Sequence, residues 1–335
     1  MSFSSMKTCF ATYDKDKDNA LDFEEFVDLC HDLFRHDGDG ETYHLSIDEK
    51  KTFFATFDVN DDQFVDEEEF RLCWEEWIKT IINPRSCLIV VDVQNDFISG
   101  TLNMSNCVAR QNGVEVIEPI NLLLHDCTFD AVVYTYDWHP EDHISFIDNV
   151  HLHELHSASK ISAGNAKTYD TVVFDGIAPM TQTLWPRHCV QNTWGSELHE
   201  DLNVVEGSVK IYKGKDPKID SYSAFWDNLK FSETRLGAEI RERNVTDVYV
   251  CGLAYDVCVG ATALDALNLG FRTILVEDCT RGVDLNEIDR TREKILESYG
   301  VVVDSNEVKD MVTGVDRRPE LGYKMALELK RRGRV

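Results

Sequence analysis

The chain has 335 residues, of which 43% are hydrophobic and 10% aromatic, and it carries a formal net charge of −27 at pH 7. This length and composition are typical of a globular protein of two domains, and no apolar run approaches the ~20 residues that span a bilayer. The charge argues against nucleic acid and anionic membrane surfaces as partners, because both would repel the protein.

The N-terminal segment and the cysteines indicate the cellular compartment. The opening residues, "MSFSSMKTCFATYDKDKD", lack the apolar segment of a secretory signal, and the ten cysteines are scattered along the chain. We therefore expect free thiols in a reducing compartment, the cytoplasm, with the nucleus as an alternative. Whether the chain forms a homo-oligomer stays open.

The first quarter of the chain is far more acidic than the rest. Residues 1–86 hold 9 basic and 22 acidic residues, a net charge of −13, whereas the remaining 249 residues hold 25 and 39. Pro84 discourages a helix from continuing, and an apolar strand pattern follows it. We expect a small all-α domain over 1–83 and a larger domain over 84–335.

Two twelve-residue segments of the acidic domain share one pattern, "DKDKDNALDFEE" and "DVNDDQFVDEEE". This is the pattern of the EF-hand loop, in which carboxylate, amide and carbonyl oxygens surround Ca²⁺ and a final glutamate binds it with both oxygens. An acidic surface turn is the alternative for a single segment. The predicted calcium ligands are Asp14, Asp16, Asp18, Ala20, Asp22 and Glu25 in the first loop, and Asp58, Asn60, Asp62, Phe64, Asp66 and Glu69 in the second.

The sixth loop position departs from the pattern, which has glycine there for a sharp turn. Asn19 and Gln63 occupy it, and asparagine tolerates positive φ better than glutamine, so we expect the first loop to bind calcium more tightly. Apolar Leu21 and Val65 at the eighth position predict a short strand pair between the loops. Residues 35–44, "RHDGDGETYH", lack a closing glutamate, and we interpret them as a linker.

From Cys87 onward, short apolar segments alternate with segments of helical periodicity. Strands are predicted over "CLIVVDV", "DAVVYTYD", "DVYVCGLA", "RTILVED" and "YGVVVDS", with helices such as "VEVIEPINLLLHDC" and "TREKILES" between several of them. This alternation is typical of an α/β fold with a mostly parallel, doubly wound sheet. Ligands of such sheets bind beyond the carboxyl ends of the strands, so polar residues there are the candidates for a functional site.

Acidic and imidazole groups follow the first two of these strands. Asp92 ends the first strand, where an unpaired buried carboxylate would be costly. Asp137 and His139 lie two residues apart, so in an extended segment they face one side and can bind one metal ion. His143 and His188 add imidazoles, and such a set suits zinc, iron or manganese. Each residue taken singly also fits an ordinary surface position.

Two cysteines surround the end of a later strand. Cys251 lies inside "DVYVCGLA", and we interpret it as a packing residue. Cys258 lies where the strand turns into a helix, where unpaired N–H groups and the helix dipole favour a thiolate and an oxyanion. Taken alone, Cys258 fits a buried apolar role better than a catalytic one, and Lys213, at the end of a strand-like segment, fits a solvated position better.

Five segments in order resemble the motifs of nicotinamidases within the isochorismatase-like cysteine hydrolases: "DVQNDF", "DWHPEDHISF", "LWPRHCVQNTWGSEL", "IYKG…YSAF" and "GLAYDVCVGAT". The resemblance covers residues 87–305 and leaves the acidic domain outside it, as a fused EF-hand pair. It implies a catalytic triad of Asp92, Lys213 and Cys258.

The resemblance also implies the remaining site residues. The metal ligands are Asp137, His139 and His188, with His143 as a fourth that some members use and others replace by water. Phe97, Trp185 and Tyr222 match the aromatic side chains around nicotinamide. The N–H groups of Ala254 and Cys258 match an oxyanion hole, which in the family follows a cis peptide at Leu253-Ala254.

The implied reaction converts nicotinamide to nicotinate and ammonia through a thioester on Cys258, in NAD salvage, with zinc, iron or manganese in the active site and calcium in the EF-hands. Two alternatives stay open. One is a related metal-dependent amidase for another small amide, against which the complete metal set argues. The other is a calcium-responsive, non-enzymatic binding protein, against which the intact triad argues.

Overall fold

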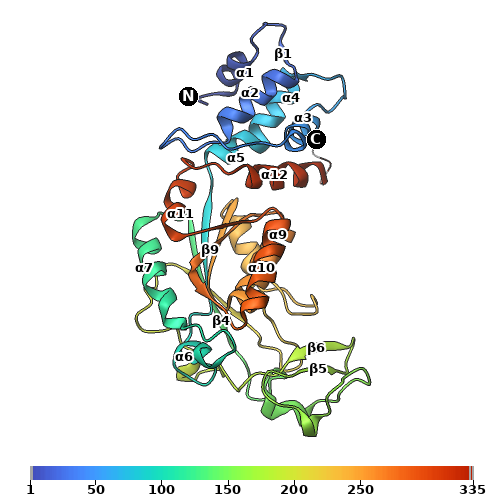
Figure 1. Ribbon diagram of the computed structural model, residues 1–335, viewed down its shortest axis with the longest axis vertical. Helices are drawn as coiled ribbons and strands as arrows, with labels where there is room; N and C mark the ends of the chain where they lie inside the picture. The colour runs from blue at the N-terminus through green and yellow to red at the C-terminus, as the bar shows by residue number, and fades with distance from the viewer. Residues whose placement is uncertain (1–2, 332, 334–335) are drawn as a thin grey trace.

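The computed structural model describes residues 3–331 and 333, and a helical N-terminal region lies at one end of the α/β region (Figure 1). The N-terminal region contains two helix-loop-helix units. Its elements are α1 (Met6–Tyr13), β1 (Ala20–Leu21), α2 (Phe23–Leu33), α3 (Ile47–Phe57), β2 (Val65–Asp66), α4 (Glu67–Cys73), the π-helical turn η1 (Trp74–Ile78) and α5 (Lys79–Ile82).

The helix that leaves each acidic loop starts at a capping box formed by the loop itself. The Asp22 carboxylate accepts a hydrogen bond from Glu25 N at 2.9 Å, while the Glu25 carboxylate accepts one from Asp22 N at 3.2 Å. Asp66 and Glu69 repeat this arrangement at the start of α4. A capping box provides hydrogen-bond acceptors for N–H groups of the first turn that have no partner within the helix. The same residues that are predicted calcium ligands therefore also start α2 and α4.

The two loops are joined by one antiparallel strand pair. Leu21 lies opposite Val65 in β1 and β2, and both side chains are fully buried. This confirms the strand pair predicted from the apolar eighth position of each loop.

The α/β region is built on six strands in the order β10-β9-β8-β3-β4-β7, and every neighbouring pair is parallel. The predicted α/β class is confirmed, and this sheet is parallel throughout. Its strands are β3 (Ser86–Val91), β4 (Ala131–Asp137), β7 (Val209–Lys213), β8 (Asp247–Leu253), β9 (Arg272–Arg281) and β10 (Val301–Val303).

Helices cover both faces of the sheet, as Figure 1 shows. Side chains of β3 alternate between the two layers: Leu88 and Val90 join one hydrophobic core, whereas Ile89 and Val91 join the other. The first core receives α7 (Ile117–Asp126) and α11 (Ser305–Val312). The second receives α8 (Leu236–Glu242), α9 (Gly260–Asn268) and α10 (Leu285–Glu297).

The chain between β4 and β7 is a long insertion with little regular structure. It contains the hairpin of β5 (Thr171–Phe174) and β6 (Met180–Thr183), which has a small hydrophobic core of its own. His156 N, in the histidine-rich segment before the hairpin, donates a hydrogen bond to Val173 O at 2.8 Å. Short turns complete the region: α6 (Asn95–Ile98), η2 (Met104–Asn106), η3 (Gly113–Val116), η4 (Ile147–Leu152), η5 (Ala163–Asn165), η6 (Trp194–Ser196) and the π-helical η7 (Tyr255–Val259).

The last helix, α12 (Pro319–Arg331), lies between the α/β region and the N-terminal region (Figure 1). Residues 35–44, interpreted as a linker from the sequence, contact the segment that precedes α12: Asp37 N donates a hydrogen bond to Val315 O at 2.8 Å. The two regions are therefore joined by contacts far apart in the sequence as well as by the covalent connection at Pro84.

Two expectations from composition are answered by the structure. All ten cysteines are free thiols, and nine of them are buried. Among the residues that the structure describes, every helix is too short or too polar to cross a membrane.

The close approach of β3 and β8 depends on Gly252, whose φ is +107°. A Cβ there would lie 2.1 Å from the carbonyl oxygen of Val91. We expect Gly252→Ala to lower the free energy of unfolding by roughly 2 kcal/mol or more, because the two central strands must separate. Urea unfolding measures this. Gly164→Ala, which adds a Cβ to open space, is the control, and equal midpoints for the two variants would contradict the close packing.

Candidate active site

The ammonium group of Lys213 lies at the centre of the candidate site. Its Nζ is 2.8 Å from Asp92 Oδ2, an ion pair without the directionality of a hydrogen bond, and it also forms an ion pair with Asp137. It donates hydrogen bonds to Cys258 Sγ at 3.2 Å and to the carbonyl of Ser221 at 3.0 Å. The Lys213 and Asp92 side chains are fully buried. One buried cation thus holds two carboxylates and a sulfur together.

Parallel strands bring these residues to one edge of the sheet. Asp137 and Lys213 are register partners at the ends of β4 and β7, and Asp92 directly follows β3. Asp92 has a φ of 47°, a left-handed conformation that is uncommon outside glycine, and the Thr135 hydroxyl donates to its Oδ1 at 2.5 Å. The strand ends and this turn therefore aim three charged groups at one point.

Burial and the neighbouring charges together determine the pKa values of these groups. Burial alone would lower the pKa of Lys213, but Asp137 and Asp92 outweigh it and raise that pKa well above its usual value. Burial raises the pKa of the Cys258 thiol and of the Asp92 carboxyl, while Lys213 acts in the opposite direction on both. The lysine therefore stays charged, and a proton leaving the thiol has a nearby carboxylate that readily accepts it.

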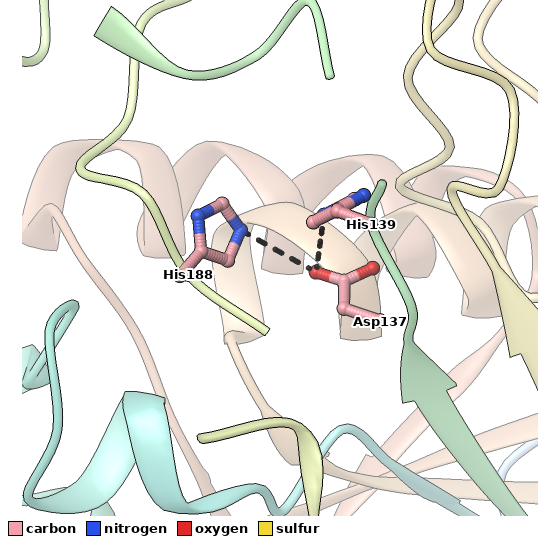
Figure 2. A group of neighbouring side chains, drawn as sticks. All are labelled: Asp137, His139 and His188. Atoms are coloured by element: carbon pink, nitrogen blue, oxygen red, sulfur yellow. Dashed lines mark ion pairs between the residues drawn. The ribbon is translucent and has the colours of Figure 1, made fainter. Parts of the chain in front are cut away.

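Asp137, His139 and His188 form a second cluster around one point (Figure 2). Asp137 Oδ2 lies 3.5 Å from His139 Nε2 and 3.7 Å from His188 Nε2. The Nδ1 atoms of the two histidines lie 2.8 Å from Gly214 O and 2.7 Å from Pro186 O. Only a protonated Nδ1 can donate a hydrogen bond to these carbonyls. In a neutral imidazole with its proton on Nδ1, the Nε2 atom carries a lone pair, and in both histidines this atom faces Asp137.

His143 lies beside this cluster. Its ring stacks on that of His139 with centroids 3.9 Å apart, and its buried Nε2 has no hydrogen-bond partner among the described residues. Burial lowers the pKa of His143 well below its usual value, so the imidazole is neutral. Its Nε2 also lies 4.0 Å from Asp220 Oδ1. An unpaired buried nitrogen beside three metal-type ligands fits a transition-metal site with one further protein ligand available.

Nitrogen and oxygen ligands in this number are those of a zinc, iron or manganese site. The residues available to hold such an ion are Asp137, His139 and His188, whose ligand atoms lie within 4.8 Å of one another, whereas the ligand atom of His143 lies within that distance of His139 and Asp220. The carbonyls of Gly214 and Pro186 orient two of the imidazoles, which is how backbone groups commonly support metal-binding histidines.

A pocket opens beside both clusters. Phe97, Trp185 and Tyr222 line it, together with His188 and Cys258, so the predicted aromatic residues share one pocket with the metal-type cluster and the sulfur. The sequence did not single out several further lining residues. These are Leu102, Met104, Cys107, Asp220, Val257 and Val283.

The backbone around Cys258 has the strand-to-helix turn that the sequence predicted. The Leu253-Ala254 peptide is cis, Ala254 lines the pocket, and Cys258 lies in η7 directly before α9. The Ala254 carbonyl accepts hydrogen bonds from the N–H groups of Val257 and Val259 at 3.0 Å each. Cys251, by contrast, is fully buried within β8.

Gln94 is a site residue that sequence reasoning missed. Its side chain accepts a hydrogen bond from Asp137 N at 2.9 Å and donates one to Asp137 O at 2.8 Å. It also donates to Ser196 O at 2.9 Å. Gln94 lies in the quoted segment "DVQNDF", and its burial with a bidentate backbone contact fixes the position of the metal-type carboxylate.

The first acidic loop of the N-terminal region has the geometry of a cation site. Oxygens of Asp14, Asp16 and Glu25 lie within 4.8 Å of one another, and Asp14 Oδ1 is buried without a hydrogen-bond partner among the described residues. Asn19 and Gln63, at the position where the pattern has glycine, adopt φ values of 71° and 74°. A buried, unpaired carboxylate oxygen fits a bound calcium ion, which supplies the positive charge that the loop lacks.

Comparison with known proteins defines the family. Residues 86–307 match the isochorismatase domain model, and residues 3–72 match the model of an EF-hand domain pair. The chain belongs to the isochorismatase family and carries an EF-hand pair before that domain.

Three relatives describe the similarity further. The chain is 35% identical to the nicotinamidase of Escherichia coli over 62% of this chain and 87% of that protein. It is 37% identical to the nicotinamidase of Saccharomyces cerevisiae over 62% of this chain and 94% of the relative. The crystal structure of the yeast nicotinamidase bound to the inhibitor nicotinaldehyde matches with a TM-score of 0.56 and 32% identity, over 65% of this chain and 99% of that one.

The metal-type cluster yields a prediction that does not depend on activity. We expect His188→Ala to lower the affinity for the transition metal by about tenfold or more, because a site with few protein ligands tolerates little loss. Metal content per chain after dialysis measures this. His151→Ala, which removes an exposed histidine, is the matched control. Full metal occupancy in His188→Ala would show that the ion binds elsewhere.

Proposed function

We propose that the protein is a nicotinamide amidohydrolase that converts nicotinamide to nicotinate and ammonia. The observation that carries the proposal is the Lys213 ammonium between Cys258 Sγ and Asp92, beside a pocket lined by Phe97 and Tyr222. The similarity to nicotinamidases, one of them bound to nicotinaldehyde, supports this substrate class.

The first half of the proposed reaction forms a thioester. Asp92 accepts the proton of the Cys258 thiol, and Lys213 stabilises the resulting thiolate at 3.2 Å. The sulfur attacks the carboxamide carbon, and the carbonyl oxygen becomes an oxyanion that the N–H groups of Ala254 and Cys258 stabilise by roughly 3 kcal/mol per donor. Asp92 then gives its proton to the leaving nitrogen, so that ammonia departs as the C–N bond breaks.

The second half of the reaction releases the acid. A water molecule loses a proton to Asp92 and attacks the thioester carbon, and the same N–H groups hold the oxyanion. The C–S bond breaks, the sulfur regains the proton from Asp92, and nicotinic acid leaves and loses its proton in solution to become nicotinate. The balance is one amide and one water consumed, with one carboxylate and one ammonium formed after ammonia is protonated in solution.

The metal-type cluster has a separate role in the proposal. When bound by Asp137, His139 and His188, a zinc, iron or manganese ion supplies Lewis acidity toward the pyridine nitrogen of the substrate. Phe97 and Trp185 then confine the ring between this cluster and Cys258, because both line the pocket that joins the two.

A substrate panel tests the proposed specificity. We expect ammonia release from nicotinamide and from pyrazinamide, because each has a ring nitrogen that can bind a metal ion. We expect about background release from benzamide, which has no ring nitrogen. Ureido substrates test the alternative of a related amidase. Faster hydrolysis of an ureido substrate than of nicotinamide would favour that alternative over the proposal.

A cysteine pair tests the nucleophile. We expect Cys258→Ala to lower kcat by roughly 10³-fold or more, as loss of a nucleophile does in comparable triads, without unfolding the chain. Cys251→Ala is the matched control, since it removes a buried sulfur of β8 and is expected to reduce the melting temperature while leaving most of kcat. Retained turnover in Cys258→Ala would refute the assignment.

A further inference from the structure

The C-terminal helix α12 joins the hydrophobic cores of the two regions. Ala326 and Leu329 are buried in the core of the N-terminal region, whereas Leu321 is buried in a core of the sheet. The helix backbone approaches closely at Gly322, where a Cβ would lie 2.3 Å from Phe34 Cζ. Figure 1 shows α12 between the two regions.

Aromatic side chains of the N-terminal region form the surface that receives α12. Trp77 is fully buried, and its Nε1–H donates a hydrogen bond to Gly322 O at 2.9 Å. Phe53 lies 5.0 Å from the Trp77 ring and 5.8 Å from the ring of Tyr323, measured between centroids. EF-hand pairs commonly bind an amphipathic helix in an apolar groove. In this protein, a helix of the same chain occupies the aromatic surface.

Polar contacts fix the segment that enters α12. Arg317 is buried and donates hydrogen bonds to Leu33 O at 2.6 Å and to Asp37, which lies between the two EF-hands. The hydrogen bond from Arg317, together with that from Arg35, lowers the pKa of Asp37 to about 2, so Asp37 and Arg317 stay ionised at neutral pH. The Tyr43 hydroxyl donates to Asp316 at 2.6 Å. Polar contacts from residues 35–44 therefore hold the start of α12 in place, and we call this set of contacts the polar clasp.

The calcium loops are connected to α12 through rigid helices. Glu25, which closes the first loop, lies in the first turn of α2, and the far end of α2 carries Leu33 and Phe34, which contact Arg317 and Gly322. Glu69 closes the second loop in the first turn of α4, and the same helical segment continues through η1 with Trp77. Both closing glutamates thus begin helices whose other ends hold the C-terminal segment.

We propose that α12 is an internal target helix of the EF-hand pair, so that calcium binding in the loops and docking of α12 form one linked equilibrium. Calcium that positions Glu25 and Glu69 also positions the helices that hold α12, and docked α12 in turn favours the calcium-bound loops. Calcium then strengthens the attachment between the N-terminal and α/β regions. The proposal is independent of nicotinamide hydrolysis, because its residues lie outside the candidate active site.

Hydrogen exchange of the full-length chain tests the linkage directly. We expect amides in residues 319–331 to exchange about tenfold faster with a calcium-selective chelator than with saturating calcium, at fixed zinc. Amides of β3 serve as the internal control, because they lie in the central sheet and should exchange equally slowly in both conditions. Identical exchange of 319–331 with and without calcium would overturn the proposal.

A variant of α12 tests the reciprocal effect. Gly322→Leu places a side chain against Phe34 and should weaken calcium binding about tenfold, measured by competition with a chromophoric chelator. Gly164→Leu is the matched control, since it adds the same side chain in open space far from the loops and should leave calcium affinity unchanged. Equal calcium affinity in both variants would show that docking and binding are separate.

Two further variants keep the test decisive if Gly322→Leu fails to fold. Arg317→Gln removes the polar clasp without adding bulk, and it should also weaken calcium binding. A double variant, Glu25→Gln with Glu69→Gln, should make the exchange of residues 319–331 insensitive to calcium. A calcium-dependent change that persists in the double variant would contradict coupling through the loops.

Discussion

The burial of one ammonium group constrains the α/β region. Lys213 is removed from water, and a lone buried cation would be strongly destabilising. The charges of Asp92 and Asp137 offset this cost only because both carboxylates reach Nζ from neighbouring strands. The strands β3, β4 and β7 must therefore be adjacent and must end at one edge. The same arrangement places Cys258, in the turn η7 that follows β8, within hydrogen-bond distance of the lysine.

Asp137 connects the two functional clusters. One of its oxygens pairs with Lys213, and the other faces His139 and His188. Gln94 hydrogen-bonds both the N–H and the carbonyl of Asp137, which fixes the backbone position from which the carboxylate reaches both clusters. Charge at the metal-type cluster and charge at the Lys213–Cys258 contact are consequently coupled through a single side chain.

The sequence predicted the strands and most of the charged residues because their signals are local. Asp137 and His139 are two residues apart, and the strand before each candidate is a continuous apolar segment. The contact of Thr135 with Asp92 was not predictable, because it depends on the register between β3 and β4. Asp220 was missed for a related reason, since only the fold of the loop after β7 brings it to the pocket.

In the N-terminal region, too, features with a local sequence pattern could be predicted, whereas contacts between residues far apart in the sequence could not. The acidic loops are encoded within twelve residues each, and the strand pair between them was predicted from the apolar eighth position of each loop. The docking of α12 could not be predicted from the sequence, because Gly322 and Trp77 are 245 residues apart and neither has a local pattern that specifies the other.

The central claim is that the sulfur of Cys258 attacks a carboxamide. Rapid acid quenching of the protein during nicotinamide turnover, followed by tryptic digestion, tests it most directly. The expected peptide runs from Asn244 to Arg272 and contains both Cys251 and Cys258, so fragmentation distinguishes them. The account predicts a nicotinoyl group on Cys258; an acyl group on Cys251, or turnover without any acylated peptide, would contradict it.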